Sequence, residues 1–193
     1  MKFSIIAIMG RSGSGKGTQA KLLAKKTGFQ IIGTGDLLRK RARRKDILGK
    51  IIKGVLSRGG LIPTPIVFSL WMPLLEGFKR KGRARGIIFD GNPRKLYEGK
   101  MLEEMFEMFG WGGRLRICHI RLSEKEVIKR LLQRKRSDDT WRKIKGRLAY
   151  FPQEVEPMLR YYKKKRILIE VNGKQPVERL HKEILGKLKT FLK

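Results

Sequence analysis

A chain of 193 residues is long enough for one domain with a substantial buried core. Lysine and arginine number 47 against 17 aspartates and glutamates, and the formal charge of +30 favours polyanionic partners: nucleotides first, with nucleic acid or an anionic membrane surface as further candidates. One cysteine, Cys118, excludes an intrachain disulfide, and no stretch approaches the ~20 apolar residues of a membrane span, so we expect a cytoplasmic protein without a membrane partner.

The first predicted strand, residues 3–9, runs directly into a glycine-rich loop at 10–19 and then into a segment of helical composition at 20–26. This strand–loop–helix setting and the Gly-x-x-x-x-Gly-Lys spacing are typical of a phosphate-binding P-loop. The glycines let backbone N–H groups point at phosphate oxygens, and Lys16 reaches the outer phosphates of a nucleotide. A dinucleotide-binding loop is excluded, because the third glycine is missing at the required spacing.

Further short apolar runs follow, separated by long helical patterns. They lie at 29–32, 86–90, 114–121 and 166–171. Strands that alternate with helices predict an α/β fold, here a five-stranded parallel sheet with helices on both faces.

A small helical insertion is predicted at 35–64, between the second strand and the next core helix. Asp36 is a candidate N-cap for a helix over 37–44, and a second helix is expected over 47–58. A Gly-Gly…Pro-x-Pro turn ends the insertion, with Pro65 as the first residue of the core helix. Such a piece is placed to act as a hinged arm.

The core helix over 65–80 leads into the third strand, which ends at Asp90. A carboxylate at the carboxyl end of a buried strand is where α/β folds place residues that organise Mg²⁺, held largely through water. Arg94 follows a proline that fixes the turn, so its side chain is expected in the same cleft.

A capping box, Ser123-x-x-Glu126, begins the helix after the fourth strand. Basic side chains gather around the short loop that follows that helix: Arg130, Arg134, Arg136 and Arg147. We interpret them as counter-charges for phosphates in the cleft. Pro152 and Pro157 interrupt the next long helical pattern and predict a kink or break.

Together these motifs resemble the adenylate kinases, a family of nucleoside monophosphate kinases with a P-loop kinase fold. The resemblance spans the chain in order: Gly-x-x-Gly-Ser-Gly-Lys-Gly-Thr-Gln at 10–19, Thr-Gly-Asp-Leu-Leu-Arg at 34–39, Gly-x-Leu-Ile-Pro at 59–63, Asp-Gly-Asn-Pro-Arg at 90–94, Lys-Arg-Leu-Leu-Gln-Arg at 129–134, Arg-Ser-Asp-Asp at 136–139 and Gly-Arg-Leu at 146–148. It implies Mg²⁺-dependent, reversible phosphoryl transfer from ATP to AMP, giving two ADP.

The resemblance also implies roles residue by residue. ATP binding falls to Gly13, Ser14, Gly15, Lys16, Gly17, Thr18, Arg130 and Gln175. The acceptor monophosphate falls to Thr34, Arg39, Gly60, Ile62, Arg94 and Glu98, and catalysis to Lys16, Arg94, Arg134, Arg136 and Arg147. Asp90, with Asp36, is expected to hold Mg²⁺ through water.

The lid is one departure from the family, because only about residues 134–140 are available where many relatives carry a long insertion. With one cysteine in the chain we expect no structural zinc. A minimal lid excludes less water, so we predict more ATP hydrolysis without acceptor than in long-lid relatives.

Glu98 is the departure with most consequence, because it stands where adenylate kinases usually place a base-reading Gln. A carboxylate only accepts hydrogen bonds, which suits the donor edges of guanine or cytosine better than adenine N1. Thr34, in contrast, is typical of the AMP-specific members. AMP is the preferred acceptor, CMP, UMP or GMP is the alternative, and Glu98→Gln is expected to raise activity on AMP if the carboxylate is a handicap.

A basic P-loop protein that binds nucleic acid and has little kinase activity is the alternative from another class. Such a protein has no need of Arg94, Arg134 and Arg147 at kinase spacing, so we expect nucleic acid to be at most a secondary partner. A monomer is expected.

Overall fold

The chain was analysed as a computed structural model that describes residues 3–81, 85–134 and 140–192. Five strands form one parallel sheet in the order β2-β3-β1-β4-β5. Their bounds are Ser4–Met9 (β1), Gln30–Gly33 (β2), Gly86–Asp90 (β3), Leu115–Arg121 (β4) and Leu168–Asn172 (β5). The predicted α/β fold with a five-stranded parallel sheet is confirmed.

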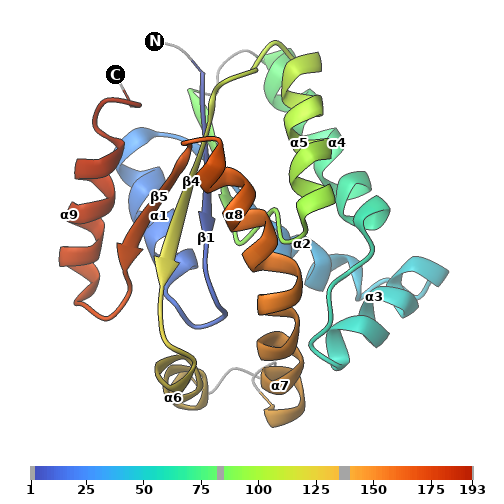
Figure 1. Cartoon of the computed structure of the whole chain (residues 1–193). Helices are drawn as coiled ribbons and strands as arrows, with labels where there is room; N and C mark the ends of the chain where they lie inside the picture. Colours follow the sequence, from blue (N-terminus) through green and yellow to red (C-terminus); the bar gives the residue numbers. More distant parts are fainter. Residues whose placement is uncertain (1–2, 82–84, 135–139, 193) are drawn as a thin grey trace.

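Helices connect every pair of consecutive strands (Figure 1). Their bounds are Lys16–Thr27 (α1), Thr34–Arg41 (α2), Ile47–Ser57 (α3), Thr64–Lys81 (α4), Leu96–Met108 (α5), Glu124–Arg134 (α6), Trp141–Tyr150 (α7), Glu156–Lys164 (α8) and Val177–Leu188 (α9). A π-helical turn, Phe151–Val155, joins α7 to α8. It contains Pro152, so the predicted interruption of the long helix is confirmed.

The sheet separates two hydrophobic cores, because successive strand side chains point to opposite faces. On one face Ile6, Ile8 and Cys118 pack with residues of α1 and α9 such as Leu23 and Ile184. On the other face the strands pack against α4, α5 and α8, through Trp71, Phe106 and Met158 among others. Figure 1 shows α1 and α9 on one side of the sheet and α4, α5 and α8 on the other.

A third, much smaller core lies between α6 and α7. Its buried members are Val127, Leu131 and Ile144, and it is separate from the two cores on the sheet. This helix pair extends from the carboxyl ends of the strands at the bottom of Figure 1.

Helices α2 and α4 start differently from the sequence prediction, and α4 begins at Thr64, one residue before Pro65. Helix α2 begins at Thr34, so Asp36 lies in its first turn and does not cap it. Helix α3 does have a side-chain cap: Asp46 accepts a hydrogen bond from the backbone N–H of Gly49 at 2.8 Å, and Arg41 pairs with the same carboxylate. This ionic and capping contact fixes the turn between α2 and α3.

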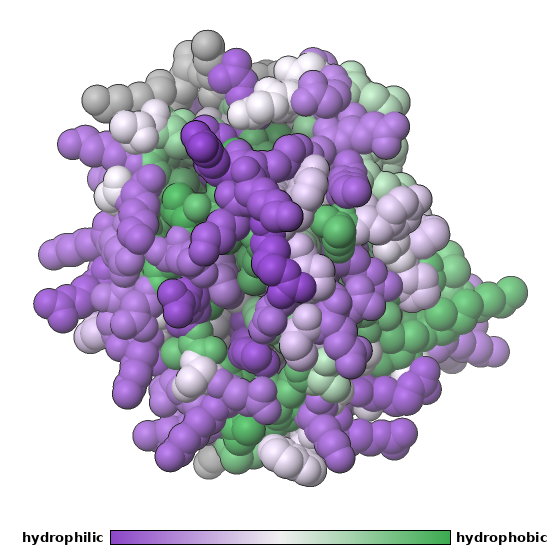
Figure 2. All heavy atoms as spheres, viewed as in Figure 1, coloured by the Kyte–Doolittle hydropathy of each residue, from purple (hydrophilic) through white to green (hydrophobic). Residues whose placement is uncertain are grey.

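Hydrophilic side chains cover most of the face shown in Figure 2. Hydrophobic spheres gather at the edge of the view where Figure 1 places α3. The exposed apolar residues of that helix are Ile47, Leu48 and Ile51.

Candidate active site

A cavity of about 660 Å³ opens at the carboxyl ends of the strands, around the glycine-rich loop. Most of the residues singled out from the sequence line it: Gly13, Gly15, Lys16, Gly17, Thr18, Asp36, Arg39, Gly60, Asp90, Arg94, Arg130, Arg134 and Arg147. Lys21, Leu38, Leu56 and Tyr150 also line it and had not been singled out as functional. In parallel α/β sheets ligands bind at this edge.

The loop between β1 and α1 owes its shape to glycines. Gly10, Gly13 and Gly15 have φ angles of 143°, 83° and 95°, which L-residues with a side chain rarely adopt. A Cβ on Gly13 would also lie only 3.0 Å from the Cγ of Leu131, so α6 packs directly on the loop. The hydroxyl of Ser14 is fully buried and has no hydrogen-bond partner among the described residues.

Lys16 projects into the cavity from the first turn of α1. Its Nζ donates to the backbone carbonyl of Arg11 at 2.8 Å. Burial lowers the pKa of Lys16 to about 8, opposed by nearby Asp90 and reinforced by Arg94, Arg134 and Arg147. Among the described residues, four cations therefore converge on one space, and Asp90 is the carboxylate that acts on Lys16.

Asp90 ends β3, and its carboxylate lies close to Gly17 of the loop. A Cβ on Gly17 would lie 3.0 Å from the Asp90 Oδ2. The missing side chain leaves room beside this carboxylate, as an ion held by one carboxylate and several waters requires. The arrangement therefore fits Mg²⁺. Asp36 is less suited, because its Oδ1 lies 2.5 Å from the Arg39 NH2.

Two arginines are positioned by contacts that the sequence did not predict. Arg94 donates from Nε to the Gly91 carbonyl at 2.7 Å and from NH1 to the Tyr150 hydroxyl at 3.4 Å. Arg147 donates to the Ser12 hydroxyl in the loop at 3.5 Å. Helix α7 thus presents Arg147 and Tyr150, three residues apart, to the cavity.

Arg130 lies on α6 and links that helix to the loop after β5. Its Nε donates to Glu126 at 2.8 Å, and its NH2 donates to the Gly173 carbonyl at 3.1 Å. Gln175 follows in the same loop but does not line the cavity; its amide donates to the Asn172 carbonyl and to Glu183. Arg136 lies outside the described residues.

The first residue of α2, Thr34, is almost fully buried and accepts a hydrogen bond from the indole of Trp71 at 2.9 Å. Ile62 and Glu98 line a separate small cavity of about 20 Å³ beside the main one. Glu98 is 2 % exposed, and its carboxylate accepts hydrogen bonds from the backbone N–H of Arg94 and the amide of Asn92. Burial raises the pKa of Glu98, opposed by these hydrogen bonds and by the Arg94 charge.

The arm formed by α2 and α3 touches α7 across the mouth of the cavity, through two glycines. A Cβ on Gly146 would lie 2.2 Å from the carbonyl oxygen of Arg58, and one on Gly59 would lie 2.3 Å from that of Lys143. Gly59 also has a φ of 73°. Both backbones approach this closely only because neither residue has a side chain.

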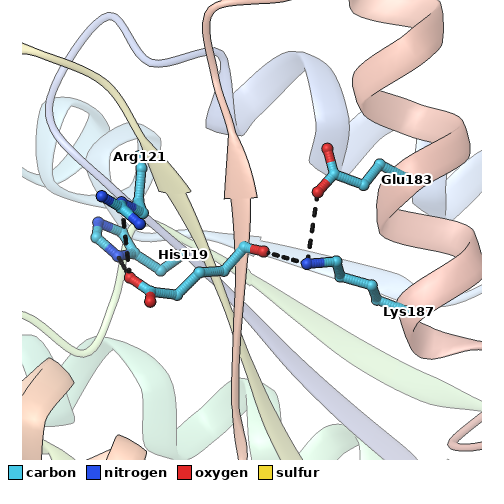
Figure 3. A network of polar contacts seen from close by, with 5 residues as sticks. His119, Arg121, Glu183 and Lys187 are labelled. Atoms are coloured by element: carbon cyan, nitrogen blue, oxygen red, sulfur yellow. Dashed lines mark hydrogen bonds and ion pairs between the residues drawn. The ribbon is translucent and has the colours of Figure 1, made fainter.

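A polar network joins β4, β5 and α9 (Figure 3). His119 Nδ1 is 3.3 Å from the Glu170 Oε1, and Lys187 donates from α9 to the Glu170 backbone carbonyl at 2.6 Å. Lys187 also pairs with Glu183 at 3.5 Å. His119 and Glu170 line a second cavity of about 640 Å³, which contains none of the predicted site residues.

The chain matches the family model described as adenylate kinase over residues 8–167. The chain belongs to the adenylate kinase family. It is 34 % identical over 187 residues to an adenylate kinase of Azobacteroides pseudotrichonymphae, which covers 95 % of this chain and 96 % of that protein. It is 35 % identical to an adenylate kinase of Parabacteroides distasonis (95 % of both chains), and 32 % identical to one of Thermus thermophilus (87 % of this chain, 88 % of that one).

Adenylate kinases transfer a phosphoryl group reversibly from ATP to AMP, giving two ADP, and this chain is a nucleoside monophosphate kinase of that family. The family uses Mg²⁺ together with ATP. Within 3–81, 85–134 and 140–192, no group of three or more His, Cys, Asp or Glu side chains is arranged to hold a metal ion by itself. No helix in the same ranges is long and apolar enough to cross a membrane.

Proposed function

We propose that the cavity of about 660 Å³ holds ATP on the loop side and AMP on the arm side, with the transferred phosphoryl group between them. The observation that supports this most is the convergence on Lys16 of three arginines from three different elements, Arg94, Arg134 and Arg147. Phosphoryl transfer requires mainly positioning and positive charge around oxygens on which negative charge spreads. The convergence supplies both.

On the donor side, backbone N–H groups of Gly13, Gly15 and Gly17 face the β- and γ-phosphates, and Thr18 lies near the α-phosphate. Lys16 exchanges its hydrogen bond with the Arg11 carbonyl for one with the outer phosphates. Arg130 and Gln175 belong to the donor adenine site in this proposal, and the hydrogen bond from Arg130 to Gly173 supports their proximity.

On the acceptor side, Arg39 and Arg94 bind the phosphate of AMP, and the arm over 35–64 carries Arg39 to the cavity. Thr34, Gly60, Ile62 and Glu98 surround the base. Arg134, Arg147 and the undescribed Arg136 approach the transferring group from α6, α7 and the short lid over 134–140. The arm is proposed as a hinged part of one domain over 1–193.

Mg²⁺ bound with ATP supplies charge neutralisation between the phosphates. Asp90 is the side chain proposed to hold it through water, supported by the room that Gly17 leaves beside the carboxylate. The carboxylate also orients Lys16, whose pKa it raises against the effect of burial.

We further propose a monomer in a reducing cytosol, with nucleic acid as a secondary partner. The single Cys118 supports the reducing compartment, because the chain offers no partner for an intrachain disulfide. Desolvation raises the pKa of this buried thiol to about 12, so it is unreactive.

The test is a coupled assay of ADP formation from ATP and each of AMP, CMP, UMP and GMP, with wild type and Arg147→Lys. We expect AMP to give the highest kcat/KM, and Arg147→Lys to lower it at least tenfold with every acceptor. A preference for CMP, UMP or GMP would replace AMP by that acceptor. Absence of ADP formation, together with steeply salt-dependent RNA binding, would refute the kinase proposal in favour of a nucleic-acid-binding function.

A further inference from the structure

The small cavity of about 20 Å³ continues the acceptor side of the main cavity, because Leu38, Leu56, Gly60 and Arg94 line both. Its volume suits one water-sized group, such as a water molecule or an amino substituent. A base bound between the arm and Arg94 therefore reaches into it with one substituent only.

Asn92 is a polar side chain on the wall of this niche with an unused hydrogen-bonding atom. The residue is 2 % exposed, and its Nδ2 donates to the Glu98 Oε2 at 3.2 Å. Its Oδ1 is buried and accepts no hydrogen bond from any described residue. A buried amide oxygen without a partner costs free energy, so a water or a ligand atom that donates to it is favoured at this position.

Glu98 fixes which way the Asn92 amide points. A carboxylate oxygen accepts and does not donate, so the amide nitrogen must face Glu98 and the amide oxygen must face away. Glu98 itself is anchored, because the backbone N–H of Arg94 donates to the same Oε2 at 2.5 Å. At the third position of α5, its charge is also favoured by the helix N-terminus.

We propose that Asn92 is a specificity-determining residue of the acceptor site, whose Oδ1 accepts a hydrogen bond from the exocyclic amino group of the base, and that Glu98 is the positioning residue that holds Asn92 in this orientation. The inference rests on the proposed function, because it places the acceptor base beside Arg94. Asn92 therefore favours an acceptor base with an amino group beside its Oδ1, as adenine has at N6. It disfavours a base with a carbonyl group at the same position. A carbonyl oxygen there would meet the Asn92 oxygen and leave both unpaired.

The proposal removes the conflict between Glu98 and AMP. The carboxylate is occupied by Asn92 and by its own helix, so it is not the group that reads adenine. Glu98→Gln is therefore expected to weaken discrimination instead of improving activity on AMP, because a Gln amide donates or accepts and lets Asn92 turn over.

The experiment compares three acceptors: AMP, purine riboside 5′-monophosphate (hydrogen in place of the amino group) and IMP (a carbonyl in place of the amino group, together with a proton on N1). The first two differ only at this substituent, so their ratio isolates it. Both kcat/KM and the Kd from calorimetry are measured. Wild type is expected to prefer AMP to purine riboside monophosphate about 5- to 150-fold, the effect of leaving one buried acceptor unpaired, and to use IMP least. Asn92→Leu, of similar size, should compress both ratios to within about threefold, and Glu98→Gln should lower the preference for AMP over IMP.

Gln153→Leu is the matched control, since it removes an exposed amide outside both cavities and should keep the wild-type ratios. Lys95→Met removes the ammonium of another residue of the niche. The proposal is overturned if Asn92→Leu keeps the wild-type ratios, or if Lys95→Met and not Asn92→Leu changes them. Because ratios are compared within each folded variant, general loss of activity does not mimic the result. Absence of ADP formation by wild type with AMP would refute the proposed function itself, which is a different outcome.

Discussion

Gly146→Ala tests whether the contact between α7 and the arm belongs to the working enzyme. The added Cβ would lie 2.2 Å from the Arg58 carbonyl oxygen, so the two backbones must separate by ~1 Å to reach ordinary contact. Overpacking of this kind costs about 1–3 kcal/mol, whereas alanine in a helix gains about 0.5–1 kcal/mol over glycine. The net cost is about 0–2.5 kcal/mol, with a midpoint of about 1.3 kcal/mol, and it falls on the arrangement in which α7 and the arm touch. We expect kcat/KM for AMP to fall about tenfold, since Arg147 is the next residue and Arg39 lies on the arm.

Gly54→Ala is the control, because a Cβ there meets nothing within 4 Å although the residue lies in α3 of the same arm. It should raise the thermal midpoint by a few degrees and leave kcat/KM unchanged. Steady-state kinetics with AMP varied and thermal unfolding of both variants give the answer. If Gly146→Ala matches Gly54→Ala in kcat/KM, the approach of the two backbones plays no part in turnover and the reasoning is refuted.

Four further predictions concern the site. Burial lowers the pKa of Lys16 to about 8, and bound phosphates favour its charged form. ATP binding at pH 8.5 should therefore take up a proton, and ATP affinity should fall as pH rises above 8. Calorimetry in two buffers of different ionisation enthalpy measures the proton uptake, which Lys16→Met should abolish. In the free protein the same lowered pKa makes the contribution of Lys16 to the free energy of unfolding increase between pH 8 and about 10.5, because the unfolded chain then binds more protons. Trp71→Phe should raise KM for AMP about threefold to tenfold by freeing the Thr34 hydroxyl, while Thr34→Val should add little to it in the double variant. ATP hydrolysis without acceptor should be faster than in a long-lid relative assayed beside it, because the short lid excludes less water. Equal rates would contradict this prediction.

Much of the fold follows from local sequence. The glycine-rich loop is predicted by glycines that allow unusual backbone angles. The strands are predicted by short apolar runs whose side chains face the two cores, and both signals lie within a short stretch of sequence. The α6 cap also follows from spacing, since the Ser123 hydroxyl accepts from the Glu126 N–H at 3.4 Å. Glu126 does not complete the reciprocal capping box, because it pairs with Arg130 instead. Arg130, four residues further along α6, competes for the Glu126 carboxylate.

The site was less predictable where residues far apart in sequence meet. The bonds from Arg94 to Tyr150 and from Arg147 to Ser12 join segments that only the folded sheet brings together. Glu98 was read from the sequence as a base-reading carboxylate, and its burial against Asn92 depends on the turn before α5. The role of each catalytic residue stays a prediction until the assays above are made.

The small core between α6 and α7 has a consequence for local stability. Three buried apolar side chains hold this helix pair, so its opening requires far less free energy than global unfolding. Leu131 of that core also lies directly beside Gly13, so opening of α6 removes a packing contact of the phosphate-binding loop. Hydrogen exchange of α6 should therefore slow when ATP binds, because a nucleotide on the loop stabilises the closed helix pair by mass action.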